Sequence, residues 1–73
     1  MKRKDVEQWM KNRKRSTLGI VYKKGDPLGV YCELRGGILY DYTGHRVNRT
    51  IDIWGYVEYE NSMPVQRPFE VGK

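Results

Sequence analysis

Apolar and polar residues alternate through the middle of the chain, and this pattern predicts a β-hairpin over residues 28–43. The apolar positions of the first predicted strand are Leu28, Val30, Cys32 and Leu34. A period of two is typical of a strand with one buried face. Gly36 and Gly37 supply the two positive-φ positions that a tight turn requires, so the chain is expected to reverse there. The return strand carries Ile38, Tyr40 and Tyr42.

The same period of two predicts one strand before this hairpin and one after it. Residues 18–24 form the first, whose inward positions are Leu18, Ile20 and Tyr22. Pro27 then fixes φ within a turn, and Gly44 occupies the turn after the hairpin. A longer strand within residues 47–60 is expected to have on its inward face Val47, Ile51, Ile53, Val57 and Tyr59. Gly55 interrupts this run and predicts a bulge or a sharp bend.

A short helix is predicted near the start of the chain, over residues 4–14. Val6, Trp9 and Met10 stand at positions i, i+3 and i+4, which gives a narrow apolar stripe. Asp5 lies where an N-cap or a favourable contact with the helix dipole is expected. An isolated helix of this length is marginal in water, so we expect Trp9 to dock against one face of the sheet.

These elements predict an α+β fold class, in which a short N-terminal helix is followed by a four-stranded antiparallel meander. A single helix covers only one face of a sheet. The other face must therefore either curl into a small open barrel of the SH3 or OB type, or meet solvent or a partner.

The last segment, residues 61–73, lacks periodicity and contains Pro64 and Pro68. It therefore predicts an extended tail, held to the body by Phe69 and Val71. The chain as a whole is predicted to form one small domain, 1–73. Its parts are a basic helical segment at 1–15, an antiparallel sheet at 18–60 and the tail at 61–73.

Length and composition restrict the chemistry that the chain can support. It has 73 residues, and a chain this short buries only about 60% of the surface that its unfolded form exposes. One cysteine excludes an internal disulfide, and one cysteine with one histidine leaves too few soft ligands for a zinc site. We therefore expect no metal and no cofactor. No signal-peptide pattern and no apolar run of about 20 residues is present, so we expect a cytoplasmic location.

Candidate catalytic side chains are few, and each has a structural explanation. His45 stands alone in a glycine-containing turn. Glu58 and Glu60 point the same way, as is common on a solvated strand. Cys32 falls among the inward residues and is expected to act as a buried small hydrophobe. We therefore predict no catalytic residue and no enzymatic activity.

Charge is distributed unevenly, and this asymmetry is the strongest functional signal in the sequence. Residues 1–15 carry seven basic and two acidic side chains, a net charge of +5, whereas residues 16–73 carry seven of each. A cationic segment of this kind attracts polyanions such as nucleic acids. Its basic residues are Lys2, Arg3, Lys4, Lys11, Arg13, Lys14 and Arg15.

We therefore predict a small nucleic-acid-binding module that takes DNA or RNA with low sequence specificity. The basic segment would contact phosphates, and aromatic side chains on the sheet would stack on bases. The aromatic candidates, predicted on the face opposite the main apolar row, are Tyr31, Trp54 and Tyr56. The flanking cations are Lys23 and Arg35, with Arg46 and Arg49 as further candidates.

The alternative is a protein-binding accessory or inhibitor module, a type common among regulators encoded by phages and mobile elements. It would dock on a larger acidic protein through the same three aromatic residues and the arginines, because these residue types also compose protein-binding hot spots. Attachment to anionic membranes is favoured less, since three apolar helix positions make a weak anchor. Homodimer formation stays open, because one helix leaves apolar sheet surface uncovered.

Overall fold

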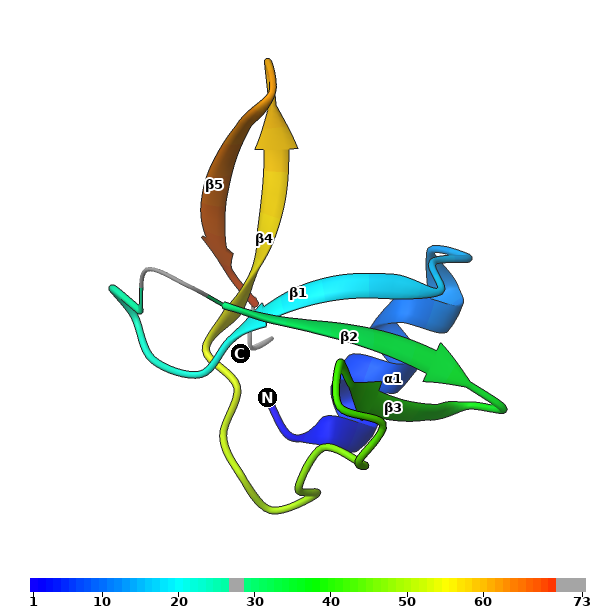
Figure 1. Ribbon diagram of the computed structural model, residues 1–73. Helices are drawn as coiled ribbons and strands as arrows, with labels where there is room; N and C mark the ends of the chain where they lie inside the picture. Colours follow the sequence, from blue (N-terminus) through cyan, green and yellow to red (C-terminus); the bar gives the residue numbers. More distant parts are fainter. Residues whose placement is uncertain (27–28, 70–73) are drawn as a thin grey trace.

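A computed structural model describes residues 1–26 and 29–69 of the protein (Figure 1). Within these residues one helix, α1 (Arg3–Asn12), precedes five strands. The strands are β1 (Thr17–Val21), β2 (Val30–Arg35), β3 (Ile38–Asp41), β4 (Gly55–Glu60) and β5 (Met63–Pro68). They form one antiparallel sheet in the order β3-β2-β1-β4-β5. The fold is therefore mixed α+β, as the sequence predicts, with one strand more than expected.

The predicted hairpin is present as β2 and β3, and the inward face of its first strand is assigned correctly. In β3 the buried residue is Leu39, which the prediction did not name. Cys32 is fully buried, and Val30 and Leu34 pack against the core. Gly36 and Gly37 have φ values of 56° and 83°, which confirms the two positive-φ positions of the turn. Part of the sequence prediction falls outside the described residues, namely at Pro27, Leu28 and Val71.

Helix α1 begins at Arg3, one residue earlier than predicted, and packs on the sheet through its apolar stripe. Val6 and Met10 are fully buried. Asp5 is not the N-cap; it lies within the first turn, where its carboxylate accepts a 3.4 Å hydrogen bond from the backbone N–H of Lys2. Within the described part of the chain, no helix is long and apolar enough to cross a membrane.

Residues 63–68 form strand β5, although the sequence predicts an extended tail there. Asn61 and Ser62 both have left-handed φ values, 51° and 67°, and they form the two-residue turn of a β-hairpin. Pro64 and Pro68 obscure the strand in the sequence, because proline lacks the N–H that a hydrogen-bonded ladder uses. Both are tolerated because β5 is an edge strand with a partner on one side only.

The long strand predicted within residues 47–60 is present only from Gly55 onward, as β4. The preceding chain passes the start of α1, where the amine and carbonyl of Met1 form hydrogen bonds of 2.8 and 2.7 Å with the backbone of Ile53. At Gly55 a Cβ atom would lie 2.1 Å from the backbone oxygen of Arg67 in β5. Glycine is therefore required for the close approach of the two chains at this point.

The two faces of β4 are reversed relative to the prediction. In the register with β1, Ile20 faces Tyr56 and Gly19 faces Val57. Tyr56 therefore lies on the helix side of the sheet, whereas Val57 and Tyr59 lie on the opposite side. A one-residue change of register moves every side chain of a strand to the other face, and the alternation within β4 does not select between the two registers.

The core lies between α1 and one face of the sheet. Its buried residues are Val6, Met10, Leu18, Ile20, Cys32, Leu39, Val47, Ile53 and Phe69. Trp9 and Tyr56 pack against Phe69 at the edge of the core, and the three rings form an aromatic cluster with centroids 4.8, 5.0 and 5.2 Å apart. This confirms that Trp9 docks on the sheet. Burial, with a smaller effect from Asp41, raises the pKa of the Cys32 thiol to about 12, in keeping with a small core hydrophobe.

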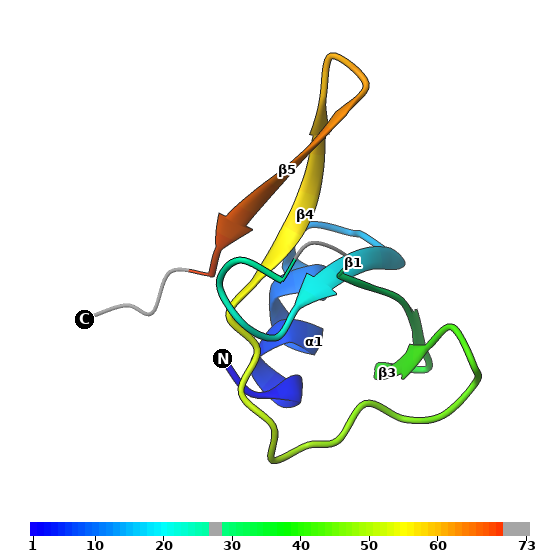
Figure 2. The ribbon, with the colours of Figure 1, turned by 60° about the vertical axis from the view of Figure 1, so that its left-hand side comes forward.

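The sheet does not close into a barrel. Among the described residues, no pairing joins the outer strands β3 and β5. The β4–β5 hairpin instead projects from the body of the molecule (Figure 2). Since α1 and the core lie on one face of the sheet, part of the opposite face is left for solvent or a ligand.

Candidate nucleic-acid interface

A groove lies on the face of the sheet that α1 does not cover. Its volume is about 470 Å³, and the residues that line it include Arg15, Gly19, Tyr31, Tyr59, Pro64 and Gln66. These residues come from the segment between α1 and β1 and from β1, β2, β4 and β5. The groove, called the sheet groove below, is therefore assembled only when β1, β2, β4 and β5 pair.

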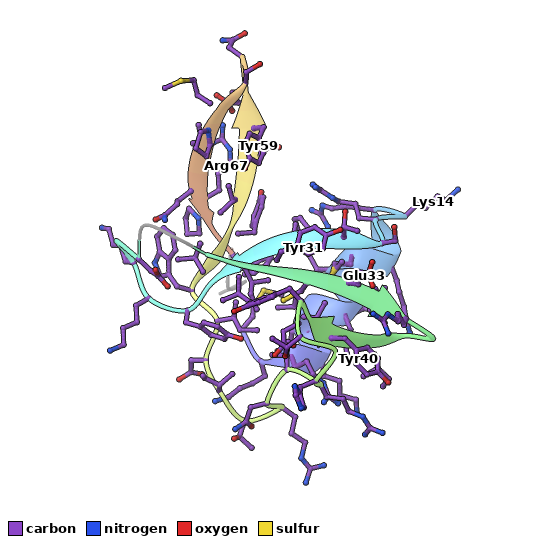
Figure 3. All side chains as sticks on the ribbon, viewed as in Figure 1. Lys14, Tyr31, Glu33, Tyr40, Tyr59 and Arg67 are labelled. Carbon is purple, nitrogen blue, oxygen red and sulfur yellow. The ribbon has the colours of Figure 1, made fainter. Side chains whose placement is uncertain are left out.

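The floor of the sheet groove lies at the centre of β1. Gly19 faces Tyr31 of β2 on one side and Val57 of β4 on the other. Because glycine has no side chain, the floor between these two neighbours is the backbone itself. Tyr31 is 54% exposed and Tyr59 is 71% exposed. They extend from β2 and β4, on the two sides of β1 (Figure 3).

One end of the sheet groove is basic because α1 stops there. Lys14 has a left-handed φ of 55°, and the N–H groups of Lys14 and Arg15 donate hydrogen bonds of 3.1 and 2.9 Å to the carbonyl oxygens of Lys11 and Met10. This is the pattern of a Schellman motif, in which glycine usually occupies the left-handed position. The motif turns the chain into β1 and brings Arg15 to the lining of the groove. The cationic helix end is defined here as Lys11, Arg13, Lys14 and Arg15.

The cationic helix end keeps its charge. No acidic side chain of the described residues pairs with Lys11, Lys14 or Arg15, and all three are exposed. Arg13 places its guanidinium carbon 4.1 Å from the centroid of the Trp9 ring, a cation–π contact that brings no negative charge to it. Lys14 extends outward from the turn (Figure 3).

The start of α1 differs, because two of its cations are held by the fold. Lys2 Nζ lies 2.7 Å from Asp52 Oδ1 and donates a 2.8 Å hydrogen bond to the carbonyl oxygen of Thr50. The hydrogen bond and charge of Lys2 lower the pKa of the Asp52 carboxyl. Lys4 is exposed at this end. Lys2 is therefore already partnered and is a weaker candidate for phosphate binding than the sequence suggests.

Arg3 is the second cation that the fold holds. Its Nε lies 2.9 Å from the carboxylate of Glu7, one turn later in α1, and the Arg3 side chain is only 15% exposed. The same Glu7 carboxylate is buried and accepts a 2.8 Å hydrogen bond from the backbone N–H of Leu39 in β3. Arg3 also donates a 3.2 Å hydrogen bond to the carbonyl oxygen of Val47. This pair therefore attaches α1 to the sheet.

The aromatic residues predicted to share a face are separated in the structure. Tyr31 lies in the sheet groove, on the predicted open face. Tyr56 does not, because its ring packs against Trp9 and Phe69 on the helix side. The prediction for Tyr56 was wrong for the reason given above, namely the reversed faces of β4. Because its ring already packs against Trp9 and Phe69, Tyr56 is not available to stack on a base.

The remaining predicted residues lie outside the sheet groove. Trp54 and Lys23 come together in a second groove of about 520 Å³, which Lys24 also lines. Arg35 pairs with Glu33 at 2.9 Å, so its charge is partly compensated. Further basic residues are exposed in the chain between β3 and β4, namely Arg46 and Arg49.

Tyr59 is the groove residue that sequence analysis missed, since it was assigned to the inward face. Asn61 and Ser62 could have revealed its position, because a two-residue turn at these residues pairs β4 with the segment that follows. That pairing places Pro64 opposite Tyr59 on the same face of the hairpin. Tyrosine and proline rings are therefore neighbours along this wall of the sheet groove.

Acidic side chains near the hairpin face away from the sheet groove. Glu58 and Glu60 both form ion pairs with Arg67 of β5. They alternate with Tyr59 along β4, so they lie on its opposite face. The carboxylates of Glu58 and Glu60 are therefore paired with Arg67 and directed away from the exposed tyrosines.

His45 and Asp41 belong to a turn. His45 is exposed, with Nδ1 2.8 Å from the hydroxyl oxygen of Thr43. Asp41 accepts hydrogen bonds from the hydroxyl and N–H of Thr43 and from the N–H of His45; the hydroxyl bond is the largest cause of a lowered pKa of its carboxyl. Across residues 1–26 and 29–69, no three His, Cys, Asp or Glu side chains are arranged to hold a metal ion.

Comparison with known proteins does not change this description. No protein-family model matches the chain, and no curated protein or solved structure is significantly similar to it. Its function has to be inferred from the sheet groove and from the charges around it.

Proposed function

We propose that this protein is a small non-enzymatic module that binds nucleic acid with low sequence specificity across the open face of its sheet. The observation that carries the proposal is the position of two exposed tyrosines, Tyr31 and Tyr59, in a groove whose lining also includes Arg15 of the cationic helix end. In proteins that bind nucleic acid, aromatic rings stack on bases and nearby basic side chains bind phosphates.

The cationic helix end supplies the electrostatic part of the interaction. Each phosphate that a Lys or Arg neutralises releases counterions, with a slope of about −0.7 in log affinity against log salt for single strands. Two to four contacts would therefore lower affinity roughly 7- to 50-fold between about 50 and 200 mM salt. The partnered cations Lys2 and Arg3 are expected to add little to this slope.

Low specificity follows from the kind of contacts available. Phosphate contacts position a nucleic acid without reading its sequence, and stacking tolerates every base because each base has a flat face. The Gln66 amide is the side chain in the groove best suited to read a base edge, but its Nε2 already donates to the carbonyl oxygen of Asp26. DNA and RNA are both expected to bind.

A pair of charge-matched variants tests the proposal. Lys14→Gln with Arg15→Gln removes the charge of Arg15, which lines the sheet groove, and that of its neighbour Lys14. Lys23→Gln with Lys24→Gln removes two charges at the second groove. Fluorescence anisotropy with mixed-sequence DNA and RNA should show a loss of at least about tenfold for the first variant and a smaller loss for the second. Equal losses, or no binding by the native protein at about 50 mM salt, would contradict the proposal.

One observation favours a protein-binding accessory or inhibitor module as the second candidate. Tyr59 and Met63 are 71% and 64% exposed on the projecting β4–β5 hairpin, and both residue types are enriched at protein interfaces. Under this alternative, the native protein would bind neither DNA nor RNA at low salt. Tyr59→Ala with Met63→Ala would then abolish crosslinking to a partner protein, whereas Lys14→Gln with Arg15→Gln would leave it intact.

A further inference from the structure

We infer that the sheet groove takes a single-stranded, unstacked segment of nucleic acid rather than a duplex. This inference rests on the proposed function and names the substrate class of the same site. Three observations carry it: the spacing of the two exposed tyrosines, the glycine between them, and the position of the charge at one end of the groove.

The register determines how far apart Tyr31 and Tyr59 stand. Tyr31 and Val57 are the two neighbours of Gly19, and Tyr59 lies two residues beyond Val57 along β4. With strands about 4.8 Å apart and a rise of about 3.4 Å per residue, the Cα atoms of the two tyrosines are roughly 12 Å apart across the floor. Neighbouring bases in one strand of a duplex are about 3.4 Å apart along the helix axis. Tyrosines set about 12 Å apart at their Cα atoms match the bases of an extended, unstacked strand better than adjacent stacked bases.

Ring exposure leads to the same conclusion. Both tyrosine side chains are more than half exposed and flank an open floor, so each offers a ring face. A duplex conceals the faces of its bases within the stack and presents phosphates and groove edges instead. A single strand presents base faces, and stacking on aromatic side chains is how such strands are held without sequence preference.

Gly19 leaves space at the floor of the groove because it has no side chain. The backbone conformation at this position would also accept a residue other than glycine. Its φ is not in the left-handed region, and an added Cβ would meet only Val57, at 3.4 and 3.6 Å. Glycine within a strand costs conformational entropy and packs nothing. The space that it leaves lets a sugar or base lie against the backbone between the two tyrosines.

The charge lies where an entering strand would place its phosphates. Arg15 lines the groove and follows Lys14, at one end of β1. Pro64 and Gln66 form the wall on the side of β5. A single strand would therefore run with its bases toward the tyrosines and its backbone toward the cationic helix end.

Binding of matched single and double strands tests the inference. The probes are a labelled single strand of about 12 nucleotides and a hairpin duplex of the same sequence. The native protein should bind the single strand at least about tenfold more tightly at equal salt. Tyr31→Ala with Tyr59→Ala should lower single-strand affinity at least about tenfold and leave duplex affinity nearly unchanged. Tyr42→Ala removes a tyrosine that is 74% exposed but does not line the groove, and it is the matched control.

A second variant tests the floor independently of the tyrosines. Gly19→Val fills the floor with a residue that strands favour, so weaker single-strand binding with an unchanged circular dichroism spectrum would support the inference. Equal or tighter duplex binding would overturn the inference and leave the proposed function standing. No binding to either probe would overturn both. A single-strand preference that survives the tyrosine and Gly19 variants would show that the strand binds elsewhere.

Discussion

The two faces of the central strand β1 are used differently. On the helix side, Leu18 and Ile20 are almost completely buried against the core. On the other side, Gly19 leaves the floor of a groove bare, and Tyr31 and Tyr59 beside it stay exposed. Burying a large apolar side chain contributes about 1.5–3 kcal/mol, and a small domain has little stability to spare. The difference indicates that the helix-side face supports the fold and that the part of the other face around Gly19 is available for binding.

Helix α1 shows the same division along its length. At its start, Lys2 and Arg3 are engaged by Asp52 and Glu7. At its other end, the cations have no acidic partner among the described residues. Of the cations at this end, Arg15 lines the sheet groove on the open face of the sheet.

Truncating one residue on each face should produce the largest contrast. Ile20→Ala should lower the free energy of unfolding by about 3 kcal/mol, because it leaves a cavity at a fully buried position. Tyr59→Ala should change it by less than about 0.5 kcal/mol, since this side chain is mostly exposed. Urea unfolding followed by tryptophan fluorescence, to which Trp9 packed against the core contributes, measures both. Similar losses for the two variants would remove the distinction between the faces.

A smaller effect is expected at the end of α1, where stability and binding should move in opposite directions. Lys14→Gly should raise the free energy of unfolding by about 0.5–1 kcal/mol, because a left-handed residue with a side chain is strained. The same change should reduce the salt slope for single-strand binding by about 0.7, because one phosphate contact is lost.

Lys14→Ala separates the two effects of that substitution. It removes the same charge but keeps a Cβ in the left-handed conformation, so binding should weaken as in Lys14→Gly without the gain in stability. Thermal unfolding and anisotropy on the same samples measure both quantities. If Lys14→Gly binds as well as the native protein, Lys14 does not contact phosphate.

The smallest expected effect is a loss of stability at low pH, when the carboxyls of Asp52 and Asp41 become protonated. The pKa of Asp52 is lowered by Lys2, and the pKa of Asp41 by Thr43 and His45. A lowered pKa in the folded state contributes stability above the unfolded value of about 3.9, and this contribution is lost as pH falls through the folded pKa.

The thermal midpoint should therefore hold steady above about pH 4 and decline below it. The decline should be modest, because Asp52 is exposed and Asp41 is only partly buried. Asp52→Asn should start from a slightly lower midpoint and show a flatter decline. A decline as steep as that of the native protein would show that the Lys2 pair does not contribute.

Features that depend on neighbours in the chain were predictable. The alternation around Cys32, the turn at Gly36 and Gly37, and the apolar stripe of Val6 and Met10 are all present in the structure. Each is set by the period of a strand or helix or by the φ values that glycine permits. For the same reason, the concentration of positive charge near the end of the helix could be recognised in advance.

The groove could be predicted only in part. Tyr31 belongs to a strand whose alternation identifies its outward face, so its place on the open side could be derived. Tyr56 and Tyr59 could not be assigned to a face of the sheet, because both faces of β4 carry apolar or aromatic residues. The register of β4 depends on its pairing with Ile20 and Gly19. Strand β5 was hidden because proline is ordinarily unfavourable in a ladder and is tolerated here only at the sheet edge.

By itself, the sequence determined where the helix and the central hairpin lie, where several of the turns fall, and that the charge is concentrated near the start of the chain. Only the tertiary structure decided which tyrosines face outward, which cations are engaged, and that a bare glycine lies between the exposed rings. The physical reason is that strand pairing and ion pairing join residues far apart in the chain. A shift of one position in that pairing exchanges the two faces of a strand while leaving its local pattern the same.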